Sequence, residues 1–250
     1  MNPYNQGYGQ GYNAASPGAY AGGVDFSAIL RQVYLWLAVG LLLGFGVAMG
    51  IGQQLAAGNP TVIDFVLNPI VMFGSIIAYI GIGFAFYPVV RRASTTMGAA
   101  LYLIFTAIFG LMISTIFIQY TASSIATAFL ATVGMFAVMS VIGFTTRMDL
   151  SKLGTILLMA VIGLVIAIVI NIFLHSAILY WIVSIAGVVI FSGLMAYDTQ
   201  WIKRQALSLA ASPSANEDLV HRVALLGAFR LFLDFVNLFL SLLRIFGRNQ

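Results

Sequence analysis

Cysteine is absent from this 250-residue chain, and charged side chains are scarce. The absence of cysteine excludes disulfides, thiolate metal sites and cysteine nucleophiles. Only 7% of the residues are Asp, Glu, Lys or Arg, whereas soluble domains carry about 25%. So few charges cannot cover a water-facing surface, and the mean hydropathy of +1.02 agrees with this. The composition therefore predicts a protein that crosses a lipid bilayer several times.

Several catalytic and cofactor motifs are also missing. The chain has no HExxH zinc motif and no phosphate-binding loop ending in GK[ST]. Its two histidines, His175 and His221, lie in different loops. No lysine follows Lys203, whereas a retinal protein needs one in its last helix for the Schiff base. We expect a protein that is not an enzyme, has no metal or cofactor and does not bind nucleic acid.

Long apolar runs are abundant. A helix spans a bilayer with ~20 apolar residues, whereas a barrel strand needs only ~10 alternating ones. The runs predict an all-α fold with seven transmembrane helices at about 33–53, 66–90, 97–118, 122–144, 153–174, 177–197 and 223–246. These helices form one domain, residues 25–250. In the first of them, Gly46 and Gly50 form a GxxxG motif, which predicts close helix packing, with dimerisation as the less favoured reading.

The positions of lysine and arginine predict the orientation of the chain. Basic residues precede the first helix and occupy every second loop, whereas the intervening loops have none. The basic residues concerned are Arg31, Arg91, Arg92, Arg147, Lys152, Lys203, Arg204 and Arg222. We therefore expect a cytoplasmic N-terminus. Residues 1–24 are rich in Gly and Tyr and are expected to be a disordered tail. The last helix can cross fully or return, so the side of the C-terminus stays open.

The stretch RLFLDFVNLFLSLLR, residues 230–244, is strongly apolar yet carries a carboxylate at its centre. At 100° per residue its polar side chains share one narrow face. This polar stripe consists of Arg230, Asp234, Asn237, Ser241, Arg244 and Arg248. A charge at the bilayer centre costs about 2.5–3.5 kcal/mol on insertion scales, so the stripe cannot face lipid. The last helix is therefore predicted to be central, with the other six around it.

Asp198 is the candidate partner of Asp234. The other acidic residues lie in loops or before helices, whereas Asp198 closes the sixth apolar run. Two carboxylates in contact at low dielectric share a proton, which makes the pair sensitive to pH. Arg91 or Arg92, on the same side of the membrane, is a candidate latch. The alternative is an Arg230–Asp234 bridge within the last helix, with Asp198 capping its own helix or reaching water.

Four stretches resemble the bacterial members of the Bax inhibitor-1 family: GFTTRMDLSKLG (143–154), VINIFLHS (169–176), VVIFSGLMAYDTQWIKR (188–204) and LFLDFVNLFLSLLRIFG (231–247). The resemblance implies a seven-helix fold with a central last helix and a pH-sensitive calcium leak through the cell inner membrane. It also implies that Asp198 and Asp234 form the pH sensor, bound by Arg91 or Arg92. A membrane-anchored protease is the implied partner. The long Ala/Ser-rich loop 205–222 departs from the family pattern.

Two other functions stay as alternatives. One is a regulatory protein that conducts no ions and binds a membrane protease, or stress or cell-death machinery. The other is an intramembrane aspartyl protease, which also carries a Tyr-Asp pair, as at Tyr197 and Asp198. The second aspartate of such a protease follows glycines at minus one and minus three, where this chain has Leu233 and Leu231. Because leucines there would block a substrate backbone, the protease is the least favoured of the three.

Overall fold

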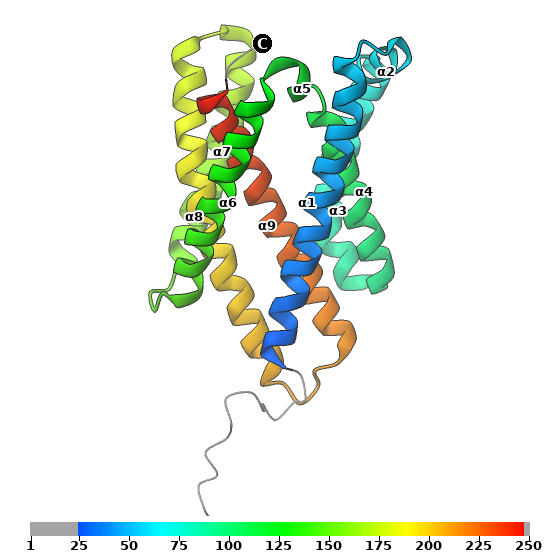
Figure 1. The fold of residues 1–250 in the computed structure, drawn as a ribbon. Helices are drawn as coiled ribbons and strands as arrows, with labels where there is room; N and C mark the ends of the chain where they lie inside the picture. The colour runs from blue at the N-terminus through cyan, green and yellow to red at the C-terminus, as the bar shows by residue number, and fades with distance from the viewer. Residues whose placement is uncertain (1–24, 248–250) are drawn as a thin grey trace, which may run out of the picture.

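The computed structural model describes residues 25–247, and its regular elements there are nine α-helices (Figure 1). In chain order these are α1 (Phe26–Ala56), α2 (Pro60–Val66), α3 (Pro69–Arg92), α4 (Thr95–Ile113), α5 (Ile116–Gln119), α6 (Ala122–Thr145), α7 (Ser151–Leu174), α8 (Ala177–Ala210) and α9 (Glu217–Phe246). Seven spans are long and apolar enough to cross a membrane, α4 and α5 together forming one of them. The predicted all-α, seven-helix fold is confirmed. The tail 1–24 and Arg248 lie outside the described residues.

Short polar side chains determine where the helices begin. Asn59 and Asn68 accept hydrogen bonds from the first backbone N–H groups of α2 and α3, and a proline follows each asparagine. Ser94, Thr121 and Ser176 cap α4, α6 and α8 in the same way. Because the capped turns between the long helices are short, consecutive long helices run antiparallel.

The last two helices extend well beyond their apolar runs. α8 continues to Ala210 and α9 begins at Glu217, capped by Asn216. The predicted loop 205–222 was therefore too long, because only residues 211–216 separate the two helices; the start of the last helix near Glu217 agrees with the acidic residues expected to open it. The missed turns are helical but too polar to belong to a membrane span. Two acidic residues in the first turn of α9, Glu217 and Asp218, complement its dipole.

α9 is the central helix, as predicted. It contacts α8, α1, α6, α4 and α3, and 67% of its apolar stretch is buried. Phe232 and Phe239 are fully buried and meet aromatic rings of α1, α4 and α6 edge to face. α9 is unbroken, and Gly247 packs against the ring of Tyr120 just before α6. The C-terminal end of α9 therefore lies opposite the start of α1 (Figure 1).

Glycines of α1 allow close helix approach, but they are not the predicted pair. Nothing lies within 4 Å of the place where a Cβ would stand on Gly46 or Gly50. By contrast, a Cβ on Gly40 would overlap the hydroxyl group of Tyr102 in α4. The predicted packing of this motif against a helix of the same chain was wrong, because Gly46 and Gly50 lie on the face of α1 that points away from the bundle; dimerisation through them stays a prediction.

Candidate functional site

Asp198 and Asp234 come together at the contact between α8 and α9. Both are buried: the side chain of Asp198 is 8% exposed and Asp234 is 4% exposed. Each carboxyl group is a hydrogen-bonding neighbour of the other. A carboxylate has no donor of its own, so this hydrogen bond needs a proton on one of the two groups. The two aspartates thus form one buried pair from residues that are far apart in the sequence.

A guanidinium from α9 completes the site. Nη2 of Arg230 lies 2.9 Å from Oδ1 of Asp198. The guanidinium also lies over two aromatic rings of α8, 4.4 Å from the centroid of Trp201 and 5.6 Å from that of Tyr197. Arg230 therefore pairs across the helix contact with Asp198, rather than along its own helix with Asp234. One carboxylate and two ring faces of α8 hold one cation of α9.

Arg91 and Arg92 lie elsewhere. Both are exposed at the end of α3, and Nη1 of Arg91 donates a hydrogen bond of 3.2 Å to the hydroxyl group of Tyr87 on the same helix. The backbone oxygen of Arg91 accepts a hydrogen bond of 2.7 Å from Arg222. Because Arg222 precedes Asp234 by twelve residues, or about 18 Å along a helix, the end of α3 meets α9 far from the carboxyl pair. In the described chain, the cation at Asp198 is Arg230.

Two oxygen atoms of the pair lack a well-aligned donor. Oδ1 of Asp198 and Oδ2 of Asp234 are completely covered, and no described residue donates a hydrogen bond of good geometry to either. For Oδ1 of Asp198, the ion pair with Arg230 is the compensating interaction. Buried charge without partners is costly. The number of protons on the pair therefore strongly affects how well α8 and α9 hold together.

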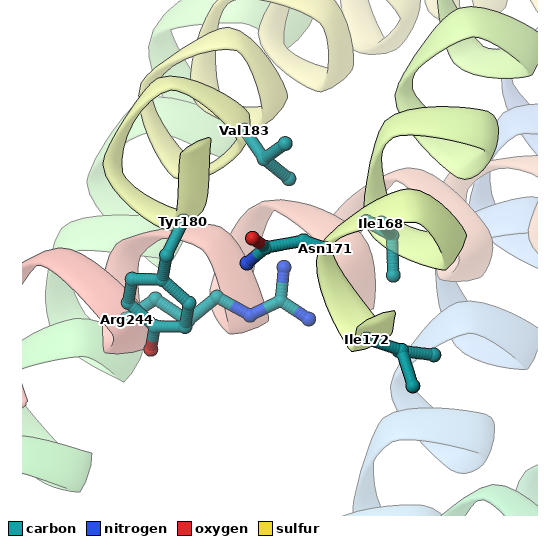
Figure 2. Close-up of a pocket in the computed structure, with 6 residues that line it drawn as sticks. All are labelled: Ile168, Asn171, Ile172, Tyr180, Val183 and Arg244. Atoms are coloured by element: carbon teal, nitrogen blue, oxygen red, sulfur yellow. The ribbon is translucent and has the colours of Figure 1, made fainter. Parts of the chain in front are cut away.

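The rest of the polar stripe follows the α8–α9 contact towards the other end of the bundle. Asn237 donates to the backbone oxygen of Leu233, and Ser241 donates to that of Asn237, both at 2.8 Å. Ser241 packs against Gly187 of α8, where a Cβ would overlap its hydroxyl oxygen. Arg244 reaches a pocket between α7 and α8 (Figure 2). The described members of the stripe, from Arg230 to Arg244, therefore follow the inner side of α9.

A separate polar cluster ties the α6–α7 loop to α8. The side chain of Gln200 bonds two backbone groups of this loop, at 2.7 and 2.9 Å. Nη2 of Arg204 lies 2.7 Å from Oδ1 of Asp149. The backbone N–H and the hydroxyl group of Ser151, together with Arg204, hold the pKa of Asp149 well below its ordinary value. The stretch YDTQWIKR thus supplies both the buried carboxylate and the anchor of a neighbouring loop.

The model of a protein family described as "Inhibitor of apoptosis-promoting Bax1" matches residues 27–250. The chain belongs to the Bax inhibitor-1 family. Inner membrane protein YbhL of Escherichia coli (strain K12) is 40% identical over 222 residues, which cover 88% of this chain and 92% of YbhL. An uncharacterized protein of Deinococcus radiodurans is 36% identical over 216 residues, covering 86% of this chain and 88% of its own.

Sequence reasoning about this Bax inhibitor-1 family protein missed the role of Arg230. The residue stood in the predicted polar stripe, but its partner was sought on its own helix. A usable signal was present in α8, where Tyr197 and Trp201 are four residues apart and so share a helix face. Two aromatic rings at this spacing beside a buried carboxylate form a site for a cation. Among the described residues, no group of three or more His, Asp or Glu side chains could hold a metal ion.

Proposed function

We propose that this Bax inhibitor-1 family protein is a pH-sensitive cation leak, closed by the contact of Asp198 and Arg230 beside Asp234. One observation carries the proposal: two interacting carboxyl groups are buried at the contact of the central helix, next to one guanidinium. With one shared proton, the site has one negative and one positive charge. Adding or removing a proton leaves a net charge in a low-dielectric interior, which is costly.

A change of protonation acts on the α8–α9 contact in either direction. A proton added to Asp198 removes the carboxylate that holds Arg230. A proton lost from the pair brings two negative charges together, and one guanidinium cannot neutralise both. Each change weakens the attraction between α8 and the central helix. We propose that α9 then shifts against α8 and that ions pass along the polar stripe.

Calcium is the proposed permeant ion, on the basis of the family resemblance. Ca²⁺ takes oxygen ligands, carboxylates above all. Ionised Asp198 and Asp234 would supply such oxygens in passing, and the side-chain oxygens of Asn237 and Ser241 lie further along the same face of α9. The polar stripe accounts for a cation route, and the choice of calcium rests on resemblance.

We propose an inner-membrane location with the N-terminus in the cytoplasm. The location follows the printed name of the relative YbhL, an inner membrane protein. The orientation follows the basic residues, which gather where α3, α6 and α8 end and α4, α7 and α9 begin. Because seven helices cross, the C-terminus is expected outside. Reporter fusions at each terminus test this: a C-terminal reporter active only in the cytoplasm would contradict it.

Calcium flux into liposomes of pure protein, measured from pH 5 to pH 9, tests the leak. We expect Asp198→Asn and Asp234→Asn to flatten the pH profile, because a neutral amide cannot gain or lose the shared proton. Arg230→Gln is expected to raise flux at the pH where the native protein is closed. Asp149→Asn is the matched control, since it removes an exposed carboxylate at the same end of the bundle. Native pH profiles in both amide variants would refute the sensor.

The same preparations separate the two alternatives. A regulatory protein would give no flux in pure liposomes and would co-purify with a membrane protease. An intramembrane protease would cleave a membrane substrate, and Asp234→Asn would abolish the cleavage. Leu231, three residues before Asp234, is fully buried, which disfavours approach of a substrate backbone. Arg91→Gln and Arg92→Gln complete the series: a change in the pH profile as large as that of Arg230→Gln would restore an arginine of α3 as the latch.

A further inference from the structure

A pocket lies at the opposite end of α9 from Arg222, between the end of α7 and the start of α8. Its volume is about 200 Å³, and its lining residues are Ile168, Asn171, Ile172, Tyr180, Val183 and Arg244. Figure 2 shows the side chain of Arg244 extending from the central helix, with its guanidinium and the Asn171 amide facing the same space. Neither the carboxyl pair nor its latch takes part in this pocket.

The polar groups of the pocket are mainly donors. The amide oxygen of Asn171 accepts a hydrogen bond of 3.0 Å from the backbone N–H of Ser176, in the tight turn that joins α7 to α8. This bond orients the amide and leaves its NH₂ group for the pocket. The guanidinium of Arg244 carries only donors. Two donor groups that face one space are suited to an anion.

Within the part of the chain that the structure describes, the positive charge of Arg244 has no acidic partner. Among residues 25–247 it forms no ion pair with a carboxylate. At this end of the bundle the acidic residue among those described is Asp64, on α2. Figure 1 shows α2 on the other side of the bundle from α7 and α8. A half-buried arginine without a counter-ion creates a local positive field, and planar guanidinium groups bind phosphate oxygens in bidentate fashion.

The surroundings match the headgroup level of a bilayer. Tyr180 and Trp181 in the first turns of α8 are partly exposed, and such aromatic residues mark membrane–water interfaces. Arg244 also borders a second hollow towards the α5 end, lined in part by Gln119 and Trp181. On the lipid side, Ile172 is 61% exposed. Polar donors thus face one side of the site, and apolar surface for acyl chains faces the other.

We propose that Arg244 and Asn171 bind the phosphate group of an anionic phospholipid from the leaflet at this end of the bundle. The guanidinium contacts two phosphate oxygens, the Asn171 amide donates to one of them, and the acyl chains lie along the outer face of α7. A headgroup with net negative charge compensates the arginine better than a zwitterionic one. The proposal does not rest on the pH sensor, because it uses none of the residues of the carboxyl pair.

Native mass spectrometry of the detergent-purified full chain, titrated with phosphatidylglycerol or phosphatidylcholine, tests the site. We expect phosphatidylglycerol to bind about tenfold more tightly than phosphatidylcholine, since its net charge adds a charge-assisted contact. Arg244→Gln removes that preference. Arg147→Gln is the matched control, because it removes one exposed positive charge from a loop at the other end and should leave the preference intact.

Asn171→Asp provides the sharper variant. The aspartate keeps an oxygen for the Ser176 N–H, so the turn is preserved, but it places a carboxylate where the NH₂ donor was. This internal counter-ion for Arg244 should abolish the preference for phosphatidylglycerol, and thermal unfolding with size-exclusion chromatography confirms that each variant is folded. Equal lipid preference in native protein, Arg244→Gln and Asn171→Asp would overturn the proposal. A last experiment tests whether the site binds free phosphate instead of a lipid headgroup. Thermal stabilisation by millimolar inorganic phosphate equal to that by phosphatidylglycerol would overturn the assignment of the bound phosphate group to a lipid.

Discussion

α9 and α7 have opposite relations to the surrounding lipid. α7 has the highest mean hydropathy of the seven spans, and 11% of its apolar stretch is buried; α9 has the lowest mean hydropathy, and 67% of its stretch is buried. In a soluble protein the more apolar helix would be the more buried one. In lipid an apolar helix gains little from burial, whereas a charged side chain on the outside is costly. The difference teaches that polarity selects the central helix of this bundle.

The packing contacts of the two helices differ in the same way as their burial. α7 contacts chiefly α8, and large side chains such as Ile166 and Phe173 are exposed on it. α9 contacts five helices, and its phenylalanines form ring contacts on several sides. Polarity therefore explains why α9 is inside, and aromatic packing explains much of how it is held there.

The largest expected effect comes from removing an aromatic ring of α9. Phe232 is fully buried among Tyr102, Phe105 and Phe109, so Phe232→Ala should lower the free energy of unfolding by about 3–5 kcal/mol. Phe173→Ala on α7 removes the same kind of ring from a position that is 80% exposed, and it should change the free energy of unfolding little. Denaturant titration in detergent or bicelles measures both. Similar losses in the two variants would contradict the division between the helices.

The second prediction concerns the charge of α9. Arg230→Gln leaves the carboxylate of Asp198 buried without a cation, and we expect a loss of about 3 kcal/mol, at the lower end for broken buried pairs because the arginine is 28% exposed. Adding Asp198→Asn should recover most of this loss, since no unpaired charge then remains. Unfolding of the single and double variants at neutral pH gives the coupling energy. Strictly additive effects would show that the two side chains do not stabilise each other.

Glycines on the two helices give the third test. A Cβ on Gly187 of α8 would overlap the hydroxyl group of Ser241 on α9, so Gly187→Ala should destabilise by about 1–2 kcal/mol through overpacking. Gly163 on α7 has open space there, and Gly163→Ala should be neutral or stabilise by about 0.5–1 kcal/mol. Ser241→Ala added to Gly187→Ala should restore part of the loss. A neutral Gly187→Ala would mean that the α8–α9 contact is looser than described.

The smallest effect is expected in the loop that leads into α7. Because the pKa of Asp149 is held below its ordinary value of 3.8, this residue stabilises the fold above that pH, and the contribution is lost as the pH falls below it. Asp149→Asn should therefore slightly lower the melting temperature at neutral pH and have no effect in strong acid. Thermal unfolding of both proteins across this range measures the difference. A difference that grows on acidification would contradict the sign.

Much of the fold could be predicted from the sequence because lipid imposes simple constraints. Apolar runs of bilayer length gave the seven spans, and the polar stripe of the last run gave its central position. The ends of α8 and α9 could not be read in this way, since their outer turns are helical but carry the charges of a water-facing segment. The roles of Gly46 and Gly50 were misjudged because spacing alone does not say which face of a helix meets a neighbour.

Two aspartates near each other in the bundle could also be inferred, because each stands in an apolar run and only one plausible partner existed for each. The identity of the cation beside the two aspartates could not be inferred from the sequence. Arg91, Arg92 and Arg230 were all compatible with the sequence, and the choice depends on distances of a few ångströms across a helix contact. The bend of the Arg230 side chain towards Trp201 and Asp198 is a property of the packed pair of helices.

The sequence by itself determined that this chain lies in a membrane as seven helices and that its last helix is enclosed by the others, since a bilayer penalises exposed charge at every step along a span. Only the tertiary structure decided which side chains meet: Arg230 at Asp198, the Ser241 hydroxyl at Gly187, and Arg244 with Asn171. Helix burial depends on summed polarity, which a sequence displays, whereas a hydrogen bond or ion pair depends on the rotation and depth of two packed helices, which local sequence leaves undetermined.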